Sequence, residues 1–340
     1  EQNMPTLKRM MELKCQLIDY ELITDDKGRR LIFFGRHAGL AGMMDTFWAF
    51  GKRLAWEGIP TPFSEIGMAH EYENLEAARS SIASVADRIK RESLPSALSP
   101  LICGFAGYGN VSLGAQEIFD LFPHEEIAPA DIEKIASSTK AVKDKLFKVI
   151  FKEEDIVEPV DTAGNFELQD YYANPQKYRS RFESYLPHLT ILVNCIYWDP
   201  RYPRLVTLDY LRRAYSNSRP PLLRIIGDIS CDIEGSIQCT VKVTDPGNPV
   251  YVYNPLDSTV TDGVEGSGPV VMAVDNLPCE LPKEASEFFG QTLTPFIPQL
   301  VNADFSGPLE NSNLPDELRR AAILHRGELT PGYEHLSRYL

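Results

Sequence analysis

The residues best suited to chemistry form one glycine-rich run, Gly107-Tyr108-Gly109-Asn110-Val111-Ser112, between an apolar segment at 100–105 and a helical pattern at 111–122. The first glycine of such a run permits a tight turn, the second lets a phosphate approach the backbone, and the helix start offers N–H groups to an anion. Ser112 stands in place of a third glycine, and its small side chain still allows the helix to pack closely on the strand. We therefore expect a dinucleotide at this turn, although methyltransferases and turns without a ligand share the pattern.

The choice between NAD(H) and NADP(H) depends on the position that follows the next strand. In NAD-selective folds an acidic residue stands about 20 residues beyond the first glycine and binds the ribose hydroxyls. The next strand is expected at 125–127, so this position is Ala128, flanked by Glu126 and Asp131. Because Ala128 leaves room for a 2′-phosphate, we expect NADP(H) to be favoured over NAD(H).

The elements around this turn predict an α/β fold with a mostly parallel sheet. Continuous apolar runs at 100–105, 189–194 and 222–228 are typical of strands that helices cover on both faces. Two segments that flank the polar turn at 25–28 predict further strands near the N-terminus, at 16–20 and 31–34. Helices are expected at 38–58, 73–92 and 111–122 and after Pro282. Small residues at 38, 39, 41 and 42 would let a second backbone pack closely against the first of these helices.

Composition excludes several classes of protein. The 340 residues carry a net charge of −14, which argues against general binding to nucleic acid or to an anionic membrane. No apolar run approaches the roughly 18 residues that cross a bilayer, and the first residues do not resemble a signal peptide. The six cysteines form no C-x-x-C pair, so we expect reduced thiols in the cytoplasm or, in a eukaryote, in the mitochondrial matrix. We expect no metal site, because Asn74 replaces the second histidine of an H-E-x-x-H motif that begins at His70.

Several motifs occur together in one order along nearly the whole chain. They are 19–21 (DYE), 34–43 (FGRHAGLAGM), 66–70 (IGMAH), 107–116 (GYGNVSLGAQ), 194–198 (NCIYW), 227–230 (GDIS), 264–268 (VEGSG), 275–278 (DNLP) and 281–286 (LPKEAS). This set resembles the lysine–ketoglutarate reductase half of α-aminoadipic semialdehyde synthase and, more distantly, the lysine-forming saccharopine dehydrogenases.

The resemblance implies an alanine dehydrogenase-like fold in which a Rossmann domain is inserted into a second α/β domain. We expect the Rossmann domain with its connecting helix at 39–279 and the substrate domain at 1–38 plus 280–340. The family's acid–base lysine and histidine lie in a segment before the part that resembles Glu1–Met4. The N-terminal part of the substrate domain is therefore expected to be missing from this chain, which alone would lack that pair.

The implied reaction condenses the ε-amine of lysine with 2-oxoglutarate to an imine, which hydride from NADPH reduces to saccharopine. The implied partners are these small molecules, together with either an N-terminal segment or a fused or separate saccharopine-cleaving enzyme. The alternative is a non-catalytic dinucleotide-binding module or subunit, which the missing acid–base pair favours. The stretches 194–198 and 275–277, which the resemblance places beside the nicotinamide ring, favour the enzyme.

Carried over position by position, the resemblance implies two sets of site residues. The cofactor would be held by Gly107, Gly109, Asn110, Val111 and Ser112, by Asn194, Cys195 and Ile196, and by Asp275, Asn276 and Leu277. The candidates for catalysis are Glu21, Arg36, His37 and His70. Some of these residues have a plain structural alternative: Glu21 as a solvated strand end, His37 or His70 as a helix cap, and Asp275-Asn276 as an ordinary turn.

Overall fold

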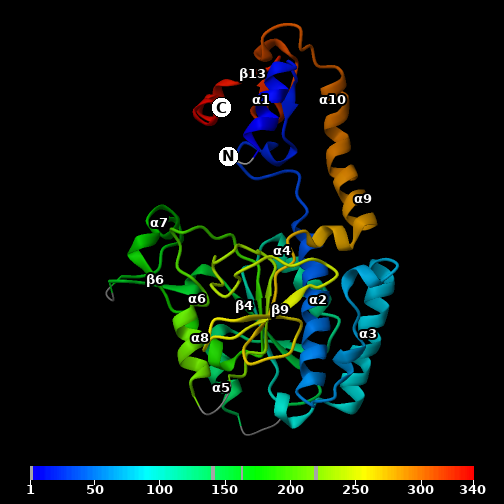
Figure 1. Ribbon diagram of the computed structural model, residues 1–340, viewed down its shortest axis with the longest axis vertical. Helices are drawn as coiled ribbons and strands as arrows, with labels where there is room; N and C mark the ends of the chain where they lie inside the picture. Colours follow the sequence, from blue (N-terminus) through cyan, green and yellow to red (C-terminus); the bar gives the residue numbers. More distant parts are fainter. Residues whose placement is uncertain (1–2, 139–141, 162–163, 218–220) are drawn as a thin grey trace. The chain divides into compact units, whose positions relative to one another are not determined.

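The computed structural model describes residues 3–138, 142–161, 164–217 and 221–340. The chain divides into two compact units, each with its own core. Unit 1 combines Glu1–Phe34 with Ala285–Leu340, and unit 2 is Gly35–Glu284. Figure 1 shows the elements of both units.

A mixed sheet of eight strands forms the centre of unit 2, within the described ranges, in the order β10-β9-β11-β8-β7-β2-β4-β3. The six strands from β11 to β3 are parallel, and β9 and β10 are antiparallel additions at one edge. Their bounds are β2 Ile102–Ala106, β3 His124–Glu126, β4 Leu146–Phe151, β7 Ile191–Asn194, β8 Ile225–Asp228, β9 Val250–Tyr253, β10 Val260–Asp262 and β11 Val270–Met272. The expected α/β class with a mostly parallel sheet is confirmed.

The two faces of the sheet carry separate apolar cores. Cys103 and Phe105 of β2 belong to the core beneath α2, α3 and α4, whereas Ile102 and Ala106 belong to the core beneath α5 and α8. Alternate side chains of a strand point to opposite faces, so a continuous apolar run is what a sheet covered on both sides requires. Figure 1 shows α2 and α3 on one side of the sheet and α5 and α8 on the other.

Helix α2 (Gly35–Trp56) packs against α4 (Asn110–Phe119) through glycines. A Cβ on Gly39 would collide with the carbonyl oxygen of Val111, and a Cβ on Gly114 would collide with that of Arg36. The close approach expected from small residues at the start of this helix is therefore confirmed. It fixes the first turn of α4, which follows the glycine run.

The other helices of unit 2 and a strand pair are shorter or lie further from the glycine run. They include η3 Ala69–Glu71, α3 Leu75–Glu92, α5 Ile132–Ala136, α6 Glu153–Ile156, β5 Val157–Pro159, α7 Leu168–Ala173, β6 Tyr178–Ser180, α8 Leu208–Tyr215 and η9 Leu277–Glu280. Helix α9, Pro282–Leu293, begins in unit 2 and continues into unit 1.

Unit 1 joins the two ends of the chain around a small core. Its elements are α1 Met4–Glu12, β1 Leu17–Ile18, α10 Ile297–Val301, α11 Asp316–Arg320, β12 Ala322–His325 and β13 Glu328–Leu329. Strand β1 pairs with β12, and Ile23 and Ile32 pack with Leu318. The strand expected at 31–34 is wrong: this segment has no strand pairing, and its side chains join the core from an irregular backbone.

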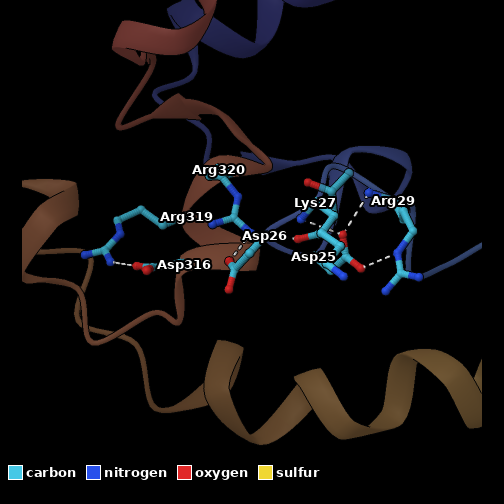
Figure 2. A network of polar contacts seen from close by, with 8 residues as sticks. Asp25, Asp26, Lys27, Arg29, Asp316, Arg319 and Arg320 are labelled. Atoms are coloured by element: carbon cyan, nitrogen blue, oxygen red, sulfur yellow. Dashed lines mark hydrogen bonds and ion pairs between the residues drawn. The ribbon is translucent and has the colours of Figure 1, made fainter. Parts of the chain in front are cut away.

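A polar network closes the turn that precedes this segment, as Figure 2 shows. The carboxylate of Asp25 accepts hydrogen bonds from the backbone N–H of Lys27 and of Arg29, each at 2.9 Å, and from the Arg29 side chain at 2.7 Å. Arg320 of α11 donates to the carbonyl oxygen of Thr24 at 2.8 Å. These groups are exposed, so they define the turn more than they stabilise the unit.

Candidate functional site

The glycine run forms a tight turn between β2 and α4. Gly107 has φ +95°, a conformation that favours glycine, and a Cβ there would lie 3.3 Å from the carbonyl oxygen of Cys195 and 3.1 Å from Cγ2 of Ile196. Its N–H donates to the carbonyl oxygen of Phe151, at the end of β4, at 2.9 Å. The turn is thus held against the ends of both neighbouring strands and has no room for a side chain.

Gly109 caps the start of α4 and leaves that start open. No side chain caps the helix, and a Cβ on Gly109 would meet no protein atom within 4 Å. The first N–H groups of a helix have no acceptor within it, and the helix dipole adds positive charge there. The two glycines therefore fit a pyrophosphate, since one makes the turn and the other leaves space for the ligand.

A cavity of about 430 Å³ opens beside the turn. Gly107, Tyr108 and Gly109 line it together with Cys195, Ile196 and Glu153. Most of the remaining wall is aromatic, formed by Phe151, Tyr171, Tyr172, Tyr197 and Tyr202, and Ile156 and Pro203 complete it. The cavity lies at the carboxyl ends of β2, β4 and β7, where parallel α/β sheets bind ligands.

The expected position of the ribose-binding residue depends on which strand lies beside β2. That strand is β4, and not the strand expected at 125–127. Strand β3 lies at the edge of the sheet and pairs with β4 alone. The position that follows the neighbouring strand is therefore occupied by Lys152 and Glu153 rather than by Ala128. Glu153 lines the cavity, and its carboxylate accepts a hydrogen bond from the Tyr172 hydroxyl at 2.6 Å. Sequence reasoning missed both residues, although a mainly apolar run at 146–151 before four charged residues was a usable strand signal.

Asn194 and Ser112 lie beneath the cavity wall and are buried. The amide of Asn194 donates to Asp228 at 2.7 Å and to the Ser236 hydroxyl at 2.8 Å. Burial raises the pKa of Asp228 to about 6, while hydrogen bonds from Thr240 and Asn194 oppose that shift. Ser112 accepts a hydrogen bond from Gln116 at 2.9 Å. These polar groups hold the strand end and the helix, while Cys195 and Ile196 form the surface.

The segment Asp275–Leu277 presents two exposed polar residues and one buried apolar one. Leu277 packs where Gly42 of α2 leaves space, beside Ile229. None of the three lines the cavity at Gly107. The structure thus brings Gly107, Gly109, Cys195 and Ile196 to one cavity and leaves this segment outside its lining.

The four candidates for catalysis occupy different surroundings. Arg36 makes a two-pronged pair with Glu117 of α4, at 3.0 and 2.8 Å, and Arg79 also contacts that carboxylate. His37 is buried, and burial first and the charge of Arg36 second lower its pKa. His70 Nδ1 lies 3.2 Å from Glu280. Glu21 belongs to unit 1, where it pairs with Arg30 at 3.2 Å.

No group of three or more His, Cys, Asp or Glu side chains could hold a metal ion within the ranges given above. No described helix is long and apolar enough to cross a bilayer.

Comparison with known proteins gives relatives over nearly the full length. No protein-family model matches the chain. It is 38% identical to α-aminoadipic semialdehyde synthase of Arabidopsis thaliana over 99% of this chain and 32% of that protein. The mitochondrial synthase of Mus musculus is 33% identical over 99% of this chain and 38% of its own length. The chain thus spans about a third of the length of these synthases.

Two more distant matches agree with these. The lysine-forming, NAD(+)-dependent saccharopine dehydrogenase of Emericella nidulans is 27% identical over 85% of this chain and 63% of that protein. An L-alanine dehydrogenase structure superposes with a TM-score of 0.52 at 15% identity, covering 98% of this chain and 71% of that one, which shows the fold alone. The chain is therefore a homologue of the α-aminoadipic semialdehyde synthases and the lysine-forming saccharopine dehydrogenases, with an alanine dehydrogenase-like fold.

Proposed function

We propose that this chain carries the dinucleotide-binding part of an oxidoreductase that joins lysine to 2-oxoglutarate and reduces the imine to saccharopine, or runs the reverse reaction. The observation that carries the proposal is the glycine turn open to a cavity at the strand ends, in a chain related over 99% of its length to α-aminoadipic semialdehyde synthase. The substrates would be lysine, 2-oxoglutarate and saccharopine.

The chain's own residues would bind and orient the reactants. A bound nicotinamide dinucleotide supplies or accepts the hydride in reactions of this class. The N–H groups at the start of α4 would hold the pyrophosphate, since Gly107 and Gly109 leave the space for it. Cys195 and Ile196 would bound the cavity beyond the turn and exclude water from it. Asp275 and Asn276 are proposed as nicotinamide contacts on the family resemblance.

For proton transfer within this chain we propose His37. Its lowered pKa keeps the imidazole uncharged near neutral pH, the state that can accept a proton. Arg36 is engaged by Glu117, so its proposed role is to hold the start of α2 on α4. Glu21 stays our proposed carboxylate on the substrate side.

The cofactor preference is proposed to depend on Glu153. The argument for NADP(H) relied on Ala128, but β3 does not pair with β2. A carboxylate that follows the strand beside the glycine strand accepts hydrogen bonds from ribose hydroxyls and repels a 2′-phosphate. We therefore propose that NAD(H) binds more tightly than NADP(H).

Titration with NADH and with NADPH, followed by nicotinamide fluorescence, tests the site. We expect binding to weaken about tenfold or more in Gly109→Val, which fills the space left for the phosphates. Gly247→Ala is the matched control, because its Cβ also meets no protein atom within 4 Å. If neither dinucleotide binds, the proposed function is wrong. Binding without turnover of lysine and 2-oxoglutarate would favour the non-catalytic module.

Glu153→Gln separates the two cofactors. The amide keeps the shape but loses the charge that repels a phosphate, so the ratio of NADPH to NADH affinity should rise about tenfold. Glu154→Gln, one position further along α6, serves as the control. An unchanged ratio would place the preference elsewhere.

A further inference from the structure

A buried pair of acids joins two distant parts of unit 2. Asp45 of α2 is fully buried, and Glu280 at the end of η9 is 3% exposed. Leu277 and Leu281 flank Glu280 and belong to the same apolar core as the neighbours of Asp45 on α2. An ionised carboxylate in such surroundings is costly unless it is paired.

The two acids have only partly satisfied oxygens. Asp45 Oδ1 accepts from the backbone N–H of Ala69 at 2.9 Å, and Glu280 Oε2 lies 3.2 Å from His70 Nδ1. The other oxygens, Asp45 Oδ2 and Glu280 Oε1, are enclosed and receive no hydrogen bond from a donor of the described chain. Glu280 is a direct electrostatic neighbour of Asp45, and a hydrogen bond between two carboxyl groups requires that one of them carries a proton.

We propose that Asp45 and Glu280 share a single proton, and that this proton fastens η9 to α2 and makes Glu280 a positioning residue for the segment Asp275–Leu277. The protonated carboxyl donates to the ionised one, as in other close carboxyl pairs that cannot both ionise. The part of the proposal that concerns Asp275–Leu277 rests on the proposed function. The shared proton does not.

Among the surrounding groups, the charges of Glu280 and Glu71 raise the pKa of Asp45, whereas the hydrogen bond from the N–H of Ala69 lowers it. Helix η3, which packs against α2 and η9, brings His70 to Glu280 and Glu71 toward Asp45. The carboxylate of Glu71 accepts the N–H of Met68 at 2.8 Å. Further along, Glu284 accepts the N–H of Leu75 at 2.9 Å. Burial first, and then the negative charge of Glu280, raise the pKa of Asp45 well above its usual value.

The raised pKa of Asp45 determines how the stability of unit 2 depends on pH. The folded chain binds the proton more tightly than the unfolded chain, so the pair stabilises unit 2 fully at a pH below the ordinary pKa of aspartic acid. This stabilisation is lost as the pH rises through the raised pKa of the folded pair. The segment 275–281 should then loosen on α2.

Thermal unfolding of the full chain between about pH 5 and pH 9 tests the shared proton. Asp45→Asn supplies a permanent N–H toward Glu280 and keeps an oxygen for Ala69, so its melting temperature should lack the alkaline decline of the natural chain. Glu280→Gln should behave alike and keeps the test available if Asp45→Asn does not fold. Asp209→Asn, on the exposed face of α8, is the control and should follow the natural chain. Parallel curves for the natural chain and both isosteric variants would overturn the proposal.

Hydrogen exchange of the amides at 275–281 tests the positioning role without any cofactor. Relative to the intrinsic rates, protection should fall with rising pH in the natural chain and stay constant in Asp45→Asn. Equal protection in both would overturn the positioning role. NADH titration over the same pH range then separates the two proposals: if no dinucleotide binds, the proposed function fails while the melting curves still decide the shared proton.

Discussion

The glycine turn and the acid pair lie in the same unit and both contact α2, yet they are built differently. The turn uses consecutive residues whose backbone conformation and lack of side chains create the site. The acid pair uses side chains far apart in sequence, Asp45 on α2 and Glu280 at the end of η9. The turn depends on the missing side chains of its glycines, whereas the acid pair depends on a proton shared by two carboxyl groups.

This difference decides how each region fails. A side chain added at Gly107 crowds Cys195 and Ile196, and one added at Gly109 fills space left open beside the turn, so steric changes should dominate there. A change at the acid pair alters charge and hydrogen bonding, so its effect should depend on pH.

The largest effect is expected for Gly39→Val. A side chain at this position collides with the backbone of α4, so the two helices must separate. We expect a loss of about 3 kcal/mol or more in the free energy of unfolding, measured by urea denaturation. Gly290→Ala is the control, because its helix site is open and no protein atom lies within 4 Å of the added Cβ. A loss below about 1 kcal/mol would show that α2 and α4 can adjust.

Gly107→Ala should be the next largest. The residue must keep φ +95°, and its Cβ approaches the backbone of Cys195, so we expect a cost of about 1–3 kcal/mol. Dinucleotide affinity should fall as well, because relief of this strain moves the turn. In Gly109→Val affinity should fall with stability unchanged. If both variants lost equal stability, the distinction between a turn-forming and a space-leaving glycine would be wrong.

The features predicted correctly from the sequence are local ones. Because Gly39 and Gly107 have no side chain, they indicate a close helix approach and a tight turn, respectively. The apolar runs indicate strands that are buried on both faces. The order of the strands in the sheet, in contrast, depends on contacts between residues far apart in the sequence. The strand after the glycine helix goes to the sheet edge and the following one inserts beside β2, so the position at Ala128 was the wrong place to examine the ribose.

The remaining errors have the same origin. Residues 31–34 have a strand-like pattern, but unit 1 uses their apolar side chains in its core without a pairing partner. The pairing of Asp45 was not predicted either, because no residue near it in the sequence indicates a contact with Glu280. Tertiary pairing over long separations decides such residues, and their types alone do not.

Thiol reactivity should distinguish the two regions by exposure. Cys195 lines the cavity behind Gly107, and burial raises its pKa, whereas Cys279 beside Glu280 is exposed. We expect Cys279 to react with a maleimide about tenfold faster than Cys195 or more, a ratio equivalent to about 1.4 kcal/mol. Peptide mass spectrometry after brief labelling measures both rates. Comparable rates would mean that the turn opens to solvent readily.

The smallest effect is expected for His70→Ala. The imidazole contacts Glu280 from a side chain that is 36% exposed, so its removal should cost about 1 kcal/mol or less. Water can replace the lost contact at Glu280 Oε2, while the proton shared with Asp45 lies on the other oxygen. The alkaline decline in melting temperature should therefore persist in His70→Ala and disappear in Asp45→Asn. If His70→Ala also abolished the decline, the titrating group would be the histidine, and the buried acids would be no more than its surroundings.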